Sequence, residues 1–215
     1  MIGQRRVVEA RRSDGRRFWA ELSVAEIAGG DTPLFTGFVR DVSERMQHEA
    51  ELSRLAERDE LTGLLNRRAI AREVEERLRD VDEHGGMAAV VFLDLDDFKA
   101  VNDERGHDVG DAVLRIAARR VRSCVRTDDA IGRWGGDELL VAARREEDRD
   151  AAGDAAAIAD RVREAVDGPV RVDDAPTPVH LSASVGWSVY PRDAPDVQGL
   201  VRHADQAMFA AKRAR

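Results

Sequence analysis

Two adjacent glycines, Gly135 and Gly136, separate two apolar runs near the middle of the chain. Because adjacent glycines tolerate positive φ angles, this pattern predicts a β-hairpin with a tight turn. The bare glycine backbone would let a phosphate approach its N–H groups. Asp137 and Glu138 follow at once and would lie on opposite faces of the second strand. Carboxylates beside a phosphate need a cation between them, so the turn indicates a site for phosphate and metal; an acidic surface hairpin is the alternative.

Length and charge narrow the class of protein. At 215 residues the chain is long enough for one sizeable domain and a smaller piece. A formal net charge of -8 argues against general nucleic-acid binding, which needs a basic surface. An acidic chain can still take a nucleotide, because a bound metal reverses the local charge. The single cysteine, Cys124, suits a reducing compartment, and no apolar run is long enough to cross a bilayer, so we expect a cytoplasmic protein.

The first sixty residues divide into strand-like and helix-like parts. Apolar residues alternate with polar ones in three segments that predict an antiparallel sheet: 5–10, 17–27 and 34–42. Three strands are few for an independent core, so we expect the tail end of a larger domain. Residues 43–59 then take a helix composition with a weak apolar stripe, which predicts either a short coiled coil or a solvated connecting helix.

From Asp59 onward, helix and strand patterns alternate as in an α/β domain. The expected helices span residues 67–82, 97–104, 109–124, 151–167 and 196–213. The expected strands span residues 88–95, the two arms of a hairpin at 129–143, and segments near 169–173 and 179–189.

The strand before residue 96 ends in a run of carboxylates. An apolar strand does not need acids at its end for packing, and Asp94 and Asp96 would point to the same face of the sheet. Asp94 aligned with Asp137 of a neighbouring strand would make a metal site of two carboxylates. Mg²⁺ fits such a site, because it shares the rest of its shell with water and substrate phosphates. The alternative for Asp96 or Asp97 is the N-cap of the helix that follows.

Downstream, Asn102 and Asp111 could together read the edge of a guanine. The acid would accept from N1–H and the exocyclic amine, while the amide would serve O6 or N3. The alternative for His107 and Asp108 is a turn at a helix start, with Asp108 as the cap.

Residues 59–68, Asp-Glu-Leu-Thr-Gly-Leu-Leu-Asn-Arg-Arg, resemble the opening of GGDEF domains, the bacterial diguanylate cyclases. Four further segments match that family in order and spacing: 94–111, 126–139, 182–186 and 204–212. The resemblance covers essentially all of residues 59–215. It implies a fold like the palm of nucleotide cyclases and polymerases, with a mostly antiparallel five-stranded sheet wrapped by helices. It also implies condensation of two GTP molecules into cyclic di-GMP with release of pyrophosphate, by a homodimer in which each subunit binds one GTP.

The resemblance further implies a role for each matching residue. The metal, Mg²⁺ or Mn²⁺, would be held by Asp94, the Leu95 carbonyl and Asp137. Catalysis would rest on Asp137, Glu138 and Lys99. The substrate would be bound by Asn102, His107, Asp111, Gly135, Gly136 and Lys212. In these roles Asn102 and Asp111 read guanine, with His107 lining the nucleotide site. The two glycines cradle phosphate, and the two lysines neutralise the triphosphate.

Arg126-Thr127-Asp128-Asp129 has the R-x-x-D pattern that precedes the hairpin in cyclases inhibited by their product. Arg126 and Asp129 match that inhibitory site, and Arg161 falls at the position of a second arginine supplied across the dimer. Arginine suits the task, because its fork can grip guanine and phosphate together. The alternative is a surface ion pair that contributes little.

The N-terminal piece resembles the last strands of a PAS sensor domain, through residues 12–19 and 37–45. We therefore expect three parts: a PAS-like fragment over 1–42, a signalling helix over 43–58 and the cyclase domain over 59–215, shortened at its C-terminal end. Leu139 and Trp134 replace the usual phenylalanine and tyrosine, and both changes keep an apolar side chain. The alternative function is a catalytically weak domain that senses GTP or cyclic di-GMP.

Overall fold

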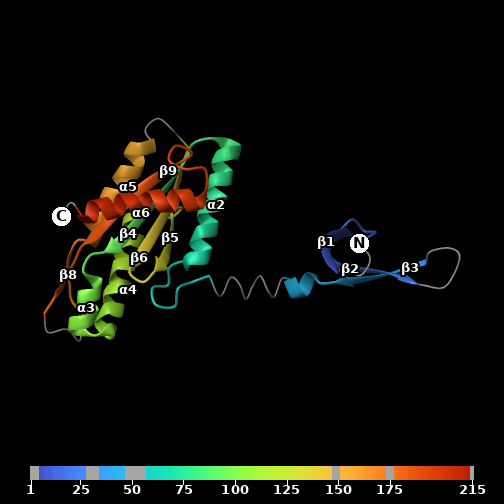
Figure 1. Cartoon of the computed structure of the whole chain (residues 1–215), viewed down its shortest axis with the longest axis horizontal. Helices are drawn as coiled ribbons and strands as arrows, with labels where there is room; N and C mark the ends of the chain where they lie inside the picture. Colours follow the sequence, from blue (N-terminus) through green and yellow to red (C-terminus); the bar gives the residue numbers. More distant parts are fainter. Residues whose placement is uncertain (1–4, 28–33, 47–56, 147–150, 173–176, 214–215) are drawn as a thin grey trace. The chain divides into compact units, whose positions relative to one another are not determined.

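The computed structural model of the chain describes residues 5–27, 34–46, 57–146, 151–172 and 177–213. The chain divides into two compact units, residues 1–56 and 57–215 (Figure 1). No helix in the described ranges is long and apolar enough to cross a membrane.

The first unit contains an antiparallel sheet of three strands in the order β1-β2-β3. The strands are β1 (Arg6–Arg11), β2 (Arg17–Ile27) and β3 (Leu34–Asp41), which confirms the three predicted segments. Large apolar side chains remain exposed on it, among them Phe38 and Val39, which keep 68% and 64% of their surface. Of the expected helix over 43–59, residues 43–46 are helical, residues 57–59 are not, and 47–56 lie outside the described residues.

The second unit is a mixed α/β domain. Its helices are α2 (Arg67–His84), α3 (Phe98–Arg105), α4 (His107–Cys124), α5 (Ala151–Val166) and α6 (Val197–Arg213). Its strands are β4 (Met87–Leu95), β5 (Ala130–Gly135), β6 (Glu138–Arg145), β7 (Gly168–Val170), β8 (Val179–Leu181) and β9 (Ala183–Tyr190). Each predicted helix of this unit is therefore present with ends shifted by a few residues, and so are the strands, except that the one strand expected near 179–189 is divided into β8 and β9, which pair in different sheets.

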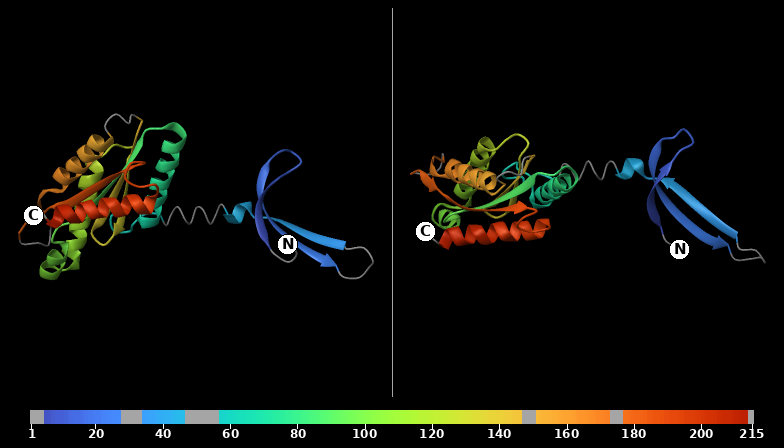
Figure 2. Two further views of the ribbon diagram at one scale, coloured as in Figure 1. Left: turned by 45° about the horizontal axis from the view of Figure 1, so that its top comes forward. Right: turned by 90° about the horizontal axis from the view of Figure 1, so that it is seen from above.

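The main sheet is antiparallel throughout, in the order β5-β6-β4-β9. Its described part has four strands, one fewer than the five expected, because β7 and β8 pair with each other in a separate ribbon. Helices cover both faces: α4 and α5 pack on one, and α2 and α6 on the other (Figure 2).

The residues of β4 show why this sheet needs helices on both sides. Every residue from Met87 to Leu93 is buried, so the strand has an apolar side chain for each face. Val91 and Leu93 pack into the core under α4 and α5, whereas Val90 and Phe92 pack under α2 and α6. A continuous apolar run is the pattern of a strand covered on both faces.

Two glycines bring helices unusually close to this sheet. A Cβ on Gly132 of β5 would lie 2.4 Å from the Ile70 side chain of α2. A Cβ on Gly186 of β9 would lie 2.2 Å from the Ala204 carbonyl oxygen and the Met208 nitrogen of α6. The absence of a side chain at Gly186 thus allows α6 to pack close to the sheet at Ala204 and Met208.

Candidate active site

The hairpin of β5 and β6, called the signature hairpin below, turns one residue later than the sequence predicts. Gly135 pairs with Glu138, so the two turn residues are Gly136 and Asp137, and only Gly136 of the two glycines has a positive φ, 48°. The register shifts between Arg133 and Gly135, which leaves Trp134 as an extra, bulged residue. Asp137 therefore lies in the turn, not at the start of the second strand.

The turn lies beside the carboxyl end of β4. Asp94 is directly opposite Glu138 in the β4–β6 ladder and opposite Ser184 in the β4–β9 ladder. Directly opposed residues share a face of the sheet, so Asp94 and Glu138 both lie on the face covered by α2 and α6. The sequence suggested Asp94 and Asp137 as partners, and the structure adds Glu138 as the direct neighbour of Asp94.

Burial and neighbouring carboxylates raise the pKa of two of these groups, Asp137 and Glu138. Burial raises the pKa of Asp137, and the negative charge of Asp94 raises it further. Burial also raises the pKa of Glu138, and Asp94, Asp137 and Asp205 add to that effect. A cation bound among them would relieve this repulsion.

The oxygen donors at this place fit a hard divalent cation. The described residues hold no group of three or more His, Cys, Asp or Glu side chains arranged for a metal. The expected set is instead the carboxylates of Asp94 and Asp137 with the carbonyl of Leu95. Mg²⁺ can bind to so few protein ligands, because water and phosphate oxygens complete its coordination shell.

Lys212, near the end of α6, supplies the cation that the structure places here. Its Nζ donates to Asp94 Oδ1 over 2.5 Å, and this hydrogen bond raises the pKa of Lys212. The ammonium of Lys212 therefore contacts the same carboxylate of Asp94 that we expect to bind the metal. Because α6 rests on Gly186, the close approach of helix and sheet is what brings Lys212 to Asp94.

Of the two candidate caps of α3, Asp97 holds the N-cap position, whereas Asp96 is bonded to two serines. Asp96 accepts hydrogen bonds from the hydroxyls of Ser182 at 2.8 Å and Ser184 at 2.6 Å, and so ties the end of β4 to the start of β9. Asp97 occupies the N-cap position of α3 with a left-handed φ of 55° and makes no side-chain cap bond.

The proposed guanine readers lie on the pair α3–α4. A Cβ on Gly110 would lie 1.9 Å from Asn102 Oδ1, so the amide of Asn102 rests on bare backbone beside Asp111. Both Asn102 and Asp111 are partly buried, whereas Lys99 and His107 are exposed. The N-cap of α4 is Gly106, not Asp108, because the helix already begins at His107. Asp111 also lines a surface pocket of about 400 Å³ together with Arg115, Arg119 and Arg171.

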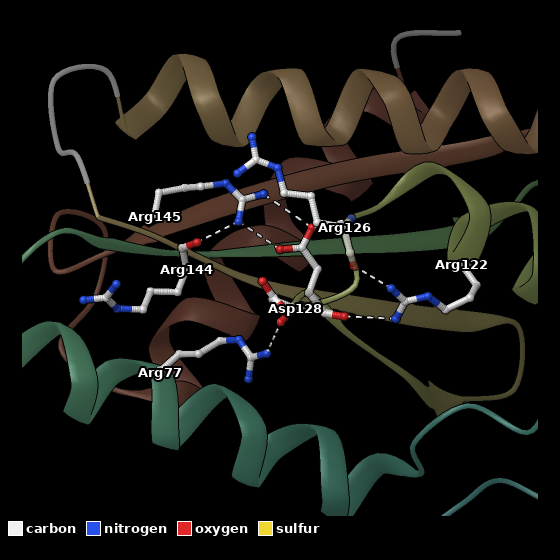
Figure 3. Close-up of polar contacts among 7 residues, drawn as sticks. Arg77, Arg122, Arg126, Asp128, Arg144 and Arg145 are labelled. Carbon is white, nitrogen blue, oxygen red and sulfur yellow. Dashed lines mark hydrogen bonds and ion pairs between the residues drawn. The ribbon is translucent and has the colours of Figure 1, made fainter.

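At the other end of the signature hairpin, Asp129 is nearly sealed from solvent and keeps 2% of its surface. Its carboxylate accepts from the backbone N–H of Arg126 at 2.9 Å and from Arg145 Nη1 at 2.9 Å. Arg122 donates to the carbonyl oxygens of Asp129 and Arg126, at 3.0 and 2.5 Å (Figure 3). The alternative of an exposed Arg126–Asp129 ion pair is therefore wrong, since the partner of Asp129 is Arg145 and the pair is buried.

A pocket of about 610 Å³ opens beside this loop. Arginines reach it from α2, from the loop and from the end of β6 (Figure 3): Arg77, Arg126, Arg144 and Arg145. Asp128, Glu146 and Asp154 complete the lining. The sequence singled out Arg126, Asp129 and Arg161 for this site; it gave no motif for Arg77, Arg144 or Arg145, which reach the pocket from α2 and β6. Arg161, on α5, does not line the pocket. It lies near Cys124, where burial raises the pKa of the thiol and the charge of Arg161 partly offsets that rise.

Comparison with known proteins agrees with this geometry. The family described as "Diguanylate cyclase, GGDEF domain" matches residues 56–215. Diguanylate cyclase TpbB of Pseudomonas aeruginosa is 36% identical over 196 residues, 90% of this chain and 44% of that protein. Cyclic di-GMP phosphodiesterase NbdA of the same organism is 36% identical over 163 residues, 76% of this chain and 20% of that protein.

Solved structures agree as well. A sensory box/GGDEF family protein of Caulobacter crescentus superposes with a TM-score of 0.68 at 36% identity, covering 74% of this chain and 99% of that one. The coiled coil and GGDEF domain of DgcB from Caulobacter crescentus, in complex with c-di-GMP, superposes with a TM-score of 0.69 at 26% identity, covering 80% and 89%. The chain belongs to the GGDEF family of diguanylate cyclase domains. It spans less than half the length of the curated relatives named above, and the fold class predicted from sequence is confirmed.

Proposed function

We propose that this protein is a diguanylate cyclase that condenses two GTP molecules into cyclic di-GMP and pyrophosphate. One observation supports this above the others: Asp94, Asp137 and Glu138 gather at the tip of the signature hairpin, where burial and neighbouring carboxylates raise the pKa of Asp137 and of Glu138. Lys212 bonds directly to Asp94 beside them. Such a surplus of negative charge next to an open glycine backbone calls for a divalent cation and a phosphate together.

The residues divide the work by their chemistry. A bound Mg²⁺ or Mn²⁺ would neutralise charge on the α-phosphate and on the leaving pyrophosphate. Asp94, the Leu95 carbonyl and Asp137 would hold it, and the backbone of Gly135 and Gly136 would contact phosphate. Asp137 would help to take the proton of the attacking 3′-hydroxyl, and Glu138 would keep the site negative.

The base and the triphosphate would be held from other elements. Asn102 and Asp111 would read the guanine from α3 and α4, with His107 beside it at the start of α4. Lys99 and Lys212 would neutralise the triphosphate. Each chain would thus carry one GTP, and a homodimer would bring two such sites face to face, which makes the rate depend on the geometry of the pair.

The arginine-lined pocket would take the product. Its arginines offer forks for guanine and phosphate. Asp129 would shape the loop from its buried position, and Arg161 would act on the product bound to the partner subunit. We also propose a cytoplasmic site of action and a PAS-like origin for residues 1–42, with residues 43–58 carrying the signal.

A second function is a domain that binds GTP or cyclic di-GMP without turnover. The similarity to NbdA favours it, because a matching stretch of chain occurs in a protein that is named a cyclic di-GMP phosphodiesterase and not a cyclase. One experiment separates the two: incubate the full chain with GTP and Mg²⁺, and resolve the products by chromatography. We expect cyclic di-GMP and pyrophosphate. Binding of GTP with no product would contradict the cyclase and support the sensor.

A further inference from the structure

The loop that opens the second unit, residues 57–66, is bonded to the signature hairpin and is called the lead-in loop below. The backbone N–H of Leu65 donates to the Ile131 carbonyl at 3.1 Å, and Arg133 N–H donates to the Leu65 carbonyl at 2.7 Å. β5 is an edge strand of the main sheet, so the loop covers backbone groups that the sheet itself leaves unpaired. The start of the unit and the hairpin are therefore one connected structure.

Asp59 is the fixed point of this loop. Its Oδ1 accepts from the Thr62 N–H at 2.8 Å and from the Thr62 hydroxyl at 2.7 Å. Burial opposes its ionisation, but the hydrogen bonds from Thr62 and the charge of Arg133 outweigh burial and lower the pKa of Asp59. The carboxylate is thus held in one place and in its charged form.

Arg133 joins Asp59 to the turn. Its Nη1 lies 3.1 and 3.3 Å from the two carboxylate oxygens of Asp59, and its Nε donates to the Gly136 carbonyl over 2.8 Å. The side chains of Arg133 and Asp59 each keep only 20% of their surface. A guanidinium can serve a carboxylate and a carbonyl in one plane, whereas a lysine has a single nitrogen for both.

A second contact fixes the bulged residue before the turn. Arg67, the first residue of α2, stacks over the ring of Trp134, with its guanidinium carbon 4.7 Å from the ring centre. Trp134 in turn meets Phe92 of β4 edge to face, with ring centres 6.2 Å apart. The bulge is therefore held between the first residue of α2 and the strand that carries Asp94.

We propose that Asp59 and Arg133 are positioning residues for the turn that carries Asp137, with Arg67 as a second hold on the same hairpin. Neither side chain of the pair is assigned to substrate, metal or product. The pair acts through the Gly136 carbonyl, which is part of the peptide that precedes Asp137. The role rests on the proposed cyclase function, because it concerns the placement of a catalytic carboxylate.

The test uses the full chain with Asp59→Asn, Arg133→Lys and the double variant. Asparagine keeps an acceptor for Thr62 but removes the charge, and lysine keeps the charge but removes the fork. Arg192→Lys is the matched control, because Arg192, like Arg133, pairs with an aspartate, Asp193, but lies outside the hairpin. Three quantities are measured: kcat and KM for GTP, hydrogen exchange of a peptide spanning 133–139 in EDTA, and the unfolding temperature.

We expect each single variant to lose about 10- to 100-fold in kcat, with KM changed by less than about threefold, because the turn is misplaced while the substrate groups remain. The 133–139 peptide should exchange faster, the double variant should resemble the worse single variant, and Arg192→Lys should behave as wild type. Unchanged kcat and exchange in both single variants would overturn the proposal, as would faster exchange throughout the domain with a matching fall in unfolding temperature. If wild type makes no product yet the peptide exchange responds as expected, the cyclase function fails while the hold on the turn stands.

Discussion

The two ends of the signature hairpin differ in the charged groups that gather there. At the turn, carboxylates crowd together, and burial with mutual repulsion raises the pKa of Asp137 and Glu138. At the far end, four arginines line a pocket beside one buried aspartate, Asp129. β5 is only six residues long and joins the two. The proposed ligands follow this difference: a cation with phosphate at the turn, and a guanine or phosphate gripped by arginine forks at the far end, where three acids share the pocket.

The two ends also differ in how they use their aspartates. Asp129 is fully engaged by Arg145 and by the Arg126 N–H, so it stabilises the fold. Asp137 is half-buried beside the negative charge of Asp94, and both effects raise its pKa, so its ionised form costs stability. The same residue type is thus paired and buried at one end, and at the other it lies where we propose the reaction takes place; the comparison can be tested at both.

The largest effect is expected at the turn. Asp137→Asn keeps the size of the side chain but removes a metal-binding and proton-accepting oxygen, so the rate should fall by roughly 1000-fold or more. Formation of cyclic di-GMP at saturating GTP and Mg²⁺ measures it. Asp97→Asn is the control, because Asp97 is exposed nearby and asparagine tolerates its left-handed backbone. Equal loss in both variants would refute the assignment of Asp137.

The next effect tests the far end of the hairpin. Asp129→Asn removes the charge opposite Arg145 in a buried pair, so the free energy of unfolding should fall by about 3 kcal/mol. Urea denaturation measures this change. Asp160→Asn breaks the exposed Asp160–Arg163 pair and should cost less than about 0.5 kcal/mol. If Asp129→Asn leaves stability intact and weakens only product binding, Asp129 is a ligand residue and not an anchor.

Gly186→Ala tests how the cation reaches the turn. The new methyl group would lie 2.2 Å from backbone atoms of α6 and must push the helix outward, at a cost of about 1–3 kcal/mol. Because Lys212 lies on α6, the bond to Asp94 should also weaken. Thermal unfolding and the KM for GTP measure the two consequences, and Gly37→Ala, where a Cβ meets only one atom at 4.0 Å, is the control. An unchanged KM would separate Lys212 from substrate binding.

A smaller effect distinguishes Arg126 from Asp129. The hydrogen bonds that the structure describes for Arg126 use its backbone, so Arg126→Ala should leave stability within about 0.5 kcal/mol of wild type. Its guanidinium lines the pocket, so affinity for cyclic di-GMP should fall about tenfold or more. Calorimetric titration and initial rates measure these quantities. A lower initial rate without loss of product affinity would contradict the pocket's proposed role.

The smallest effect concerns stability against pH. Because the folded-state pKa of Glu138 is raised, its ionisation opposes folding at neutral pH, and that penalty disappears as pH falls through the folded pKa. Glu138→Gln should therefore raise the unfolding temperature by about 1–3 °C at pH 7 and by less at pH 4. Asp59, whose pKa is lowered, should behave oppositely: Asp59→Asn should lower the unfolding temperature more at pH 7 than at pH 3.

Local chemistry made much of this protein predictable. The continuous apolar run of β4, the amphipathic helices and the glycine turn each follow from neighbours in the sequence, so their positions were correct within a few residues. The turn itself was displaced by one residue, because the bulge at Trp134 depends on partners from α2 and β4. No local pattern reveals a contact of that kind.

By itself the sequence determined the order of strands and helices, the carboxylates of the turn, the likeness to GGDEF domains and the R-x-x-D loop. Only the tertiary structure decided which charges meet: Lys212 with Asp94, Arg145 with Asp129, and Arg133 with both Asp59 and the Gly136 carbonyl. Lys212 and Asp94 are 118 residues apart along the chain, Arg145 and Asp129 are 16 apart, and Arg133 and Asp59 are 74 apart. Only the contact from Arg133 to Gly136 is local in sequence. Such pairings depend on how closely helices and loops pack on the sheet. Glycines and a β-bulge determine that packing, and the pattern of charges in the sequence does not reveal where they act.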